Sequence, residues 1–146
     1  MRDRWVAANG GIGVRPIFHL SFPVRDLQES VDFYVRQLGA QIGRRSELGA
    51  DAYVFGAQVT LQNDPAGVID PTPRTRHFGA TLPWDEWESF VKRLGDSAYV
   101  VEPPTRSYVG EPIEQGKMMI VDPSGNLIEI KAYRNPTAVL GPLAEQ

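Results

Sequence analysis

The sequence predicts an α+β fold made of two similar βαβββ modules. Each half contains an amphipathic helix that ends in Leu-Gly, and Leu38 and Leu94 at those ends lie 56 residues apart. An alternating strand precedes each helix, and the histidines in these two strands, His19 and His77, lie 58 residues apart. Self-similarity at a fixed spacing is typical of duplicated units. We therefore expect both halves to fold in the same way.

The helices are predicted from their caps and apolar stripes. The first spans about residues 26–38, with Asp26 as N-cap, Glu29 completing a capping box and Gly39 ending the helix. The second spans about residues 83–94, begins with a proline and ends before Gly95. The expected core-facing positions recur at helical spacing: Leu27, Val31, Tyr34, Val35 and Leu38, then Trp87, Phe90, Val91 and Leu94.

The strands are predicted from alternation between turn residues. In the first half they span residues 17–24, 40–45, 52–55 and 58–62, and in the second half 76–82, 98–102, 117–121 and 127–133. A turn at 122–126 joins the last two strands into a hairpin. We expect an N-terminal arm (1–15), one domain (16–133) and a C-terminal tail (134–146). Within the domain, the first module spans about 16–63, a linker 64–74 and the second module about 75–133.

Composition excludes several classes of protein. The chain has 146 residues, no cysteine and a net charge of −3. The lack of cysteine rules out disulfides, iron–sulfur clusters and thiol nucleophiles. The slight acidity argues against nucleic-acid binding. No stretch reaches the roughly 20 apolar residues of a membrane span. We expect a soluble, cytoplasmic protein that binds a small molecule.

Three polar residues stand in the middle of predicted strands. His19, His77 and Glu129 each have apolar or small neighbours on both sides, and alternation turns all three away from the helix-covered face. A carboxylate between two isoleucines is costly to bury unless it is paired or bound to a cation. Two imidazoles and one carboxylate suit a divalent metal. The alternative is that each histidine is an ordinary core residue and that Glu129 pairs with Lys131 or an arginine.

The residues that suggest this site also resemble a known family. The segments FHLSFPVRDLQESVDFYVRQLGAQ, HFGATLPWDEWESFVKRLG and DPSGNLIEIKAY are similar to those of the vicinal-oxygen-chelate superfamily. That superfamily contains glyoxalases, bleomycin resistance proteins and extradiol dioxygenases. The resemblance implies paired βαβββ modules that form a curved, partly open mixed sheet around a concave metal site, with the helices outside. It also implies His19, His77 and Glu129 as the metal ligands.

The family's four-ligand pattern is missing here. Gln58, Thr60 and Gln62 point inward from the last strand of the first half, and none is a carboxylate or histidine, so Gln62 is left as a weak fourth ligand. Three ligands resemble the 2-His-1-carboxylate set of iron(II) extradiol dioxygenases or the fosfomycin-resistance enzymes. We expect Fe(II), with Mn, Ni, Zn or Mg as alternatives.

The remaining site residues are candidates by position. Ring-cleaving relatives use a further histidine as acid–base group, which this chain lacks, so Tyr53, Tyr108 or Glu114 would replace it. The polar segment 106–115 resembles a lid over the site. The expected substrate-binding residues are Ser21, Thr60, Gln62, Arg106 and Lys131.

Three functions follow from the resemblance. The first is dioxygenase-type oxidation of a small oxygenated substrate, with aromatic compounds among the candidates. The second is non-redox lyase, isomerase or transferase chemistry. The third is metal-free binding of a drug, as in bleomycin resistance proteins, although those typically lack the three ligands. Relatives commonly pair half-units across chains, so we expect a homodimer.

Overall fold

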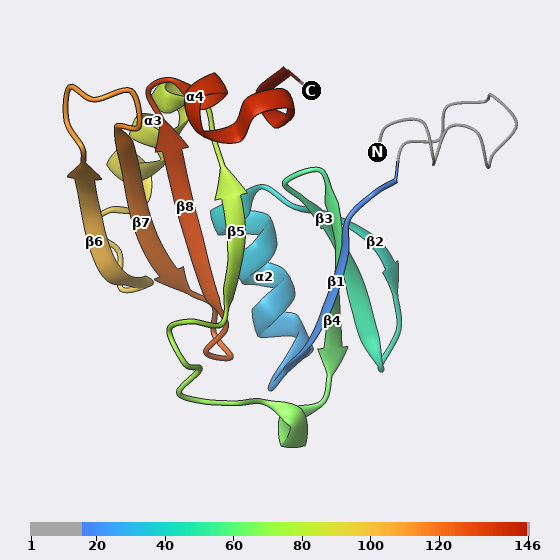
Figure 1. Ribbon diagram of the computed structural model, residues 1–146. Helices are drawn as coiled ribbons and strands as arrows, with labels where there is room; N and C mark the ends of the chain where they lie inside the picture. The colour runs from blue at the N-terminus through green and yellow to red at the C-terminus, as the bar shows by residue number, and fades with distance from the viewer. Residues whose placement is uncertain (1–15, 146) are drawn as a thin grey trace, which may run out of the picture.

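The computed structural model describes residues 16–145 and contains two four-stranded mixed sheets with helices packed against them (Figure 1). The α+β fold and the βαβββ order of both halves are confirmed. The expected N-terminal arm, residues 1–15, lies outside the described residues. None of the described helices has the length and apolar character needed to cross a membrane.

The first module forms a sheet with strand order β1-β4-β3-β2. β1 and β4 are parallel and the other pairs are antiparallel. Its elements are β1 (His19–Val24), α2 (Leu27–Leu38), β2 (Gln41–Arg45), β3 (Gly49–Val54) and β4 (Ala57–Asn63). The linker that follows contains one short 3-10 helix, η1 (Pro65–Gly67).

The second module repeats this topology with strand order β5-β8-β7-β6. β5 and β8 are the parallel pair. Its elements are β5 (His77–Thr81), α3 (Trp84–Leu94), β6 (Val100–Ser107), β7 (Gln115–Val121) and β8 (Leu127–Tyr133). The C-terminal segment forms α4 (Pro136–Leu140) and η2 (Gly141–Glu145).

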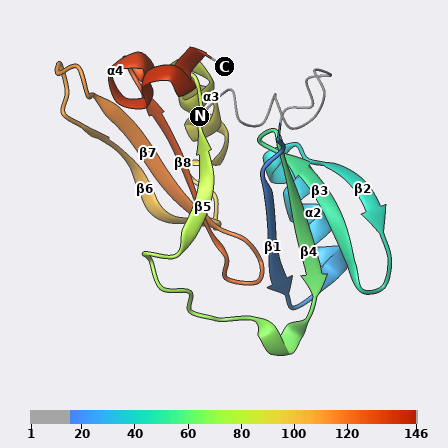
Figure 2. The ribbon, with the colours of Figure 1, turned by 45° about the vertical axis from the view of Figure 1, so that its right-hand side comes forward.

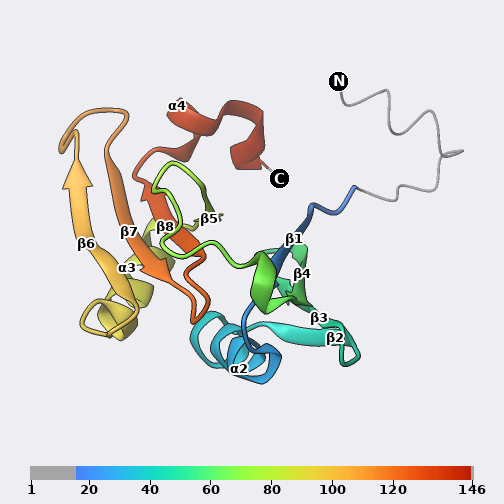
Figure 3. The same ribbon diagram turned by 90° about the horizontal axis from the view of Figure 1, so that it is seen from below.

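Both helices lie on the same side of the two sheets. Seen from below, α2 lies under the first sheet and α3 under the second (Figure 3). α2 also contacts the second module, because the Tyr34 hydroxyl donates a 2.9 Å hydrogen bond to Asp122 and the Phe33 ring packs edge-on against Tyr99. This contact holds α2 between the modules, and β1 and β5 are the strands of each sheet nearest to the other sheet (Figure 2).

The placement of α2 corrects two expectations about its sequence. Val35, expected in the core, is 40% exposed, whereas Ser30 and Phe33 are buried. The reason is that α2 packs against both its own sheet and the second module, which turns its buried face toward Phe33. Asp26 does cap the helix, but the Glu29 carboxylate accepts from Arg25 and does not complete a capping box.

Several strand boundaries also differ from the expected ones. β1 begins at His19, and Phe18, expected on the buried face, is 67% exposed just before the strand. β3 starts at Gly49, three residues earlier than expected. β6 continues to Ser107, so Arg106 belongs to a strand and the loop between β6 and β7 is shorter than the expected segment 106–115.

Candidate functional site

The faces of β8 alternate as the sequence predicts. Ile128, Ile130 and Ala132 are fully buried on the side of α3, and the residues between them are only partly buried. Glu129 therefore lies on the opposite, concave face of the second sheet, together with His77 from the neighbouring strand β5.

His77 and Glu129 contact each other on this face. His77 Nε2 lies 3.5 Å from Glu129 Oε2, and His77 Nδ1 lies 2.8 Å from the carbonyl oxygen of Arg74. Since a carbonyl only accepts, Nδ1 donates to it, which leaves Nε2 to face the carboxylate. A proton or a cation can bridge an imidazole nitrogen and a carboxylate oxygen in this arrangement. A ligating histidine commonly donates its other N–H to a carbonyl in this way.

The spacing of the two atoms also fits a shared ion. Two ligand atoms about 2.1 Å from one tetrahedral metal lie about 3.4 Å from each other. The distance between His77 Nε2 and Glu129 Oε2 is 3.5 Å. The donor chemistry and the spacing of this pair therefore fit two ligands of a divalent metal.

Charged side chains surround the pair. The Lys131 ammonium lies 3.6 Å from Glu129 Oε1, which matches the alternative pairing expected for this carboxylate. Arg74, in the linker, forms an ion pair with Glu102 on β6, and its guanidinium holds the pKa of Glu102 below the usual value. The linker is thus tied to the second sheet next to His77.

His19 occupies the corresponding position in the first module. Its Nδ1 lies 3.2 Å from the carbonyl oxygen of Gln58, so Nδ1 again donates to a carbonyl. In both histidines, Nε2 is the ring nitrogen that the backbone carbonyl does not contact. The two backbone partners differ, because the Gln58 carbonyl belongs to the neighbouring strand β4, whereas the Arg74 carbonyl lies three residues before His77 in the linker.

The structure does not bring the three expected ligands into one cluster. Among residues 16–145, no group of three or more His, Asp or Glu side chains is arranged to hold a metal ion. His77 and Glu129 form one part on the second sheet, and His19 lies on the first sheet. A cavity of about 120 Å³ lies between the two modules, and its walls include Ser21 from β1 and His77 from β5 but neither His19 nor Glu129.

The polar residues of the first sheet form a network around a carboxylate that the sequence reasoning missed. Asp51 is only 2% exposed and accepts hydrogen bonds from Thr60, Gln58 and Arg44. Gln62 donates to the Ser21 hydroxyl instead. The strand predicted from the sequence begins at residue 52, so Asp51 fell outside it; with the observed bounds of β3, alternation puts Asp51 on the same face as Tyr53.

The three acid–base candidates occupy different environments. Tyr53 lies on the concave face, in register with Gln58, which is itself in register with His19. Glu114 anchors the loop between β6 and β7, because its carboxylate accepts hydrogen bonds from the Gly110 N–H and from Arg134. The hydrogen bond from the Gly110 N–H lowers the pKa of Glu114. Tyr108 begins that loop with a left-handed backbone (φ 56°) and is half exposed.

Arg106 lies against the helix side of the second module. Its guanidinium pairs with Glu88 on α3 at 2.7 Å and lies over the Trp84 ring. Arg134 stacks on the same indole at 3.9 Å. The structure therefore places Arg106 away from the concave residues His77 and Glu129.

Comparisons with known proteins agree with this architecture. The family model described as Glyoxalase/Bleomycin resistance protein/Dioxygenase superfamily matches residues 17–130. A glyoxalase/bleomycin resistance protein/dioxygenase from Alicyclobacillus acidocaldarius is 28% identical, with a TM-score of 0.72, and the match covers 88% of this chain and 98% of that one. No curated protein matches the chain.

Two more distant structures share the fold. The fosfomycin resistance protein FosX from Listeria monocytogenes is 16% identical with a TM-score of 0.60, covering 82% of this chain and 94% of that one. TioX from Micromonospora sp. ML1 is also 16% identical with a TM-score of 0.60, covering 82% of this chain and 99% of that one.

Proposed function

Because the chain belongs to the glyoxalase/bleomycin resistance protein/dioxygenase superfamily, we propose that it is a divalent-metal-dependent enzyme acting on a small oxygenated substrate. The observation that carries this proposal is the His77–Glu129 pair, in which imidazole Nε2 lies 3.5 Å from a carboxylate oxygen while Nδ1 contacts a backbone carbonyl. His77 and Glu129 would hold the metal together with His19. The metal would act as a Lewis acid toward substrate oxygens.

The chain's own residues would bind and orient the substrate around this centre. Tyr53 is the acid–base group that we favour, because His19 and Tyr53 are both in register with Gln58, on either side of it in the sheet. Among the described contacts, the Tyr53 hydroxyl also makes no hydrogen bond. Ser21 and Gln62 offer a hydrogen-bonded hydroxyl and amide on the same face. Lys131 places a positive charge beside Glu129, where it would attract an anionic substrate group.

Dioxygenase-type oxidation with Fe(II) is the reaction that we place first. A 2-His-1-carboxylate set leaves adjacent positions open for substrate and dioxygen. Non-redox lyase, isomerase or transferase chemistry with Mn, Ni, Zn or Mg is the alternative, and the fosfomycin resistance protein among the structural neighbours motivates it. Metal content after anaerobic purification, combined with oxygen uptake, separates the two.

Metal-free binding of a small molecule is a second candidate function, and the Lys131–Glu129 ion pair is the observation that favours it. An ammonium group there neutralises the carboxylate without a metal. The test is metal analysis of the wild-type protein, H77A and E129Q, with E88Q on α3 as a matched control. The enzyme proposal requires stoichiometric metal in wild type and E88Q and its loss in H77A and E129Q. If the wild-type protein takes up no metal on reconstitution, the binding function stands instead.

The third ligand connects function to assembly. His19 lies on a different sheet from His77 and Glu129, and relatives in this superfamily commonly pair half-units across chains. We therefore propose a homodimer in which His19 of one chain completes the site of the other. Mixing H19A with H77A chains tests whether the site crosses between chains. A site shared between chains predicts that mixed dimers regain metal at half of their sites, and a site within one chain predicts no recovery.

A further inference from the structure

A β-bulge in β2 turns Arg44 toward the concave face of the first sheet. The β2–β3 ladder is in register at Ile42 and again at Arg45, and it slips between them. Gly43 and Arg44 therefore both stand opposite Asp51. An extra residue in one strand redirects the side chain that follows it, and bulges of this kind are frequent beside functional sites.

The carboxylate of Asp51 holds the guanidinium of Arg44 in one orientation. Arg44 Nε lies 2.8 Å from Asp51 Oδ2, while Thr60 Oγ1 donates to Asp51 Oδ1 at 2.7 Å. The Arg44 guanidinium lowers the pKa of Asp51, so the carboxylate stays ionised at neutral pH. Because only Nε of Arg44 bonds to Asp51, the two Nη groups lie on the exposed part of a side chain that is 84% exposed.

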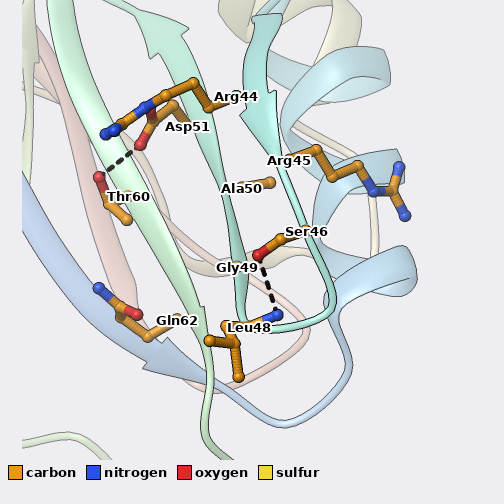
Figure 4. Close-up of a pocket in the computed structure, with 9 residues that line it drawn as sticks. All are labelled: Arg44, Arg45, Ser46, Leu48, Gly49, Ala50, Asp51, Thr60 and Gln62. Atoms are coloured by element: carbon orange, nitrogen blue, oxygen red, sulfur yellow. Dashed lines mark hydrogen bonds and ion pairs between the residues drawn. The ribbon is translucent and has the colours of Figure 1, made fainter.

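Arg44 and Arg45 both line a hollow at the β2–β3 hairpin, but their side chains turn to different sides. The hollow has a volume of about 310 Å³, and its walls also include Ser46, Leu48, Thr60 and Gln62. In Figure 4, Arg44 extends above Asp51 and Thr60, whereas Arg45 turns to the other side, toward α2. There Arg45 donates to the Gln28 side chain at 2.6 Å.

Stability alone does not account for this arrangement. An ion pair whose arginine is almost fully exposed contributes little to folding. Burying Asp51 is unfavourable unless its oxygens are satisfied, and they are satisfied here by a network that fixes the arginine. A guanidinium fixed in one plane is suited to bind a carboxylate or phosphate through two parallel hydrogen bonds.

Gln58 connects the Arg44–Asp51 pair to the proposed metal ligand His19. Its carbonyl lies 3.2 Å from His19 Nδ1, and its side-chain amide donates to Asp51. We propose that Arg44, positioned by Asp51, forms an oxyanion subsite that binds a carboxylate, phosphate or phosphonate group of the substrate. This assignment rests on the proposed function only in that the anion would belong to the substrate of the same concave site.

The experiment is a titration of the full-length protein with inorganic phosphate and, separately, with succinate. The signal is the Arg44 Nε–Hε resonance in two-dimensional NMR, assigned by its loss in R44Q. We expect millimolar binding of at least one anion by wild type, as for a small ligand held by few contacts. The tighter of the two anions identifies the substrate group as a phosphate type or a carboxylate.

Variants separate a positioned subsite from a general attraction of anions. R44Q and R44K should each weaken binding at least tenfold. R44Q loses the positive charge, whereas R44K keeps it but loses the planar guanidinium that donates two parallel hydrogen bonds. The control R36Q, which changes an arginine on α2 that does not line the hollow, should bind like wild type. D51N removes one negative charge, so attraction by charge alone predicts tighter binding, whereas a positioned arginine predicts weaker binding and faster Hε exchange. Equal affinities in wild type and R44Q, or tighter binding by D51N, would overturn the proposal.

The same titration with H77A keeps this proposal distinct from the metal-site proposal. Anion binding by H77A should equal that of wild type, because Arg44 and Asp51 belong to the other module. A wild-type protein that binds metal but neither anion contradicts the subsite alone. A wild-type protein that binds an anion but no metal contradicts only the proposed enzyme function.

Discussion

Gly79 pairs directly with Glu129 across β5 and β8, and a Cβ atom at Gly79 would lie 1.8 Å from the Glu129 carbonyl oxygen. Such an approach is far inside van der Waals contact, and the atom in the way belongs to the backbone. β5 can therefore lie this close to β8 only with a glycine at this position. His77, two residues earlier on β5, owes its contact with Glu129 to that spacing.

Replacing Gly79 with alanine should disturb both the strand pair and the site. We expect G79A to lower the free energy of unfolding by about 2 kcal/mol or more, as overpacking against backbone does, and to weaken metal binding. The corresponding residue of the first module is Ser21, which already accommodates a Cβ, so S21A is the matched control and should change unfolding by less than about 0.5 kcal/mol. Urea denaturation and metal titration measure both effects. Wild-type stability in G79A would mean that β5 and β8 do not approach as described.

Tyr34 and Asp122 connect the two modules. The Tyr34 side chain is fully buried, burial raises its pKa well above the usual value, and its hydroxyl donates to Asp122 at 2.9 Å. Removing this donor in Y34F should lower the free energy of unfolding by about 1.5–3 kcal/mol, the range for a hydrogen bond to a charged group. Y53F, which alters the exposed tyrosine on β3, is the control and should be close to wild type in urea denaturation. Equal unfolding of Y34F and wild type would argue against the contact between α2 and the second module.

The sequence was informative wherever strand periodicity alone decides the outcome. Alternation placed Glu129 opposite the buried isoleucines of β8, and DPSGN formed the turn before it. A period of two follows from strand geometry and needs no knowledge of distant contacts. The same argument applied to β3 would have revealed Asp51, whose role depends on partners from β2 and β4.

Two features could not be predicted from periodicity. The bulge in β2 shifts the alternation by one residue, so Arg44 faces Asp51 although its sequence position gives no sign of it. The placement of the first sheet relative to the second depends on two contacts of α2 with the second module. Tyr34 and Asp122 are 88 positions apart in the chain, and Phe33 and Tyr99 are 66 positions apart. That placement decides where His19 lies relative to His77, and no local pattern encodes it.

Acid should weaken the fold through Asp51. The Arg44 guanidinium lowers the pKa of this carboxyl in the folded protein below the ordinary value of 3.8. A lowered folded pKa means that the stabilisation is complete above the unfolded pKa and is lost as pH falls through the folded pKa. We expect D51N to lose less stability than wild type when the pH is lowered from 5 to 3, by about 1 kcal/mol because Arg44 is exposed and screened.

The comparison between variants isolates this effect. Burial raises the pKa of Asp122, which acts in the opposite direction but equally in wild type and D51N. D96N, on the exposed loop after α3, is the matched control and should follow the wild-type curve in urea denaturation at each pH. A D51N protein with the full wild-type loss of stability in acid would show that Asp51 is not the responsible group.

Lys131 should compete with a metal ion for Glu129. Its ammonium lies 3.6 Å from Oε1 of that carboxylate, while His77 Nε2 lies 3.5 Å from Oε2. A cation that binds between His77 and Glu129 is therefore repelled by the Lys131 ammonium, which is already paired with the Glu129 carboxylate. Removing that charge in K131Q should tighten metal binding about tenfold, equivalent to about 1.4 kcal/mol.

The competition experiment also decides between the two candidate functions. Calorimetric titration with Mn²⁺ or Zn²⁺ should give tighter binding by K131Q than by wild type, and unchanged binding by K92Q on the outer helix α3. At higher ionic strength the difference should shrink, because salt screens the repulsion between Lys131 and the metal. If neither wild type nor K131Q binds metal, Glu129 is neutralised by Lys131 alone. Glu129 then belongs to a surface that binds a small molecule and not to a metal centre.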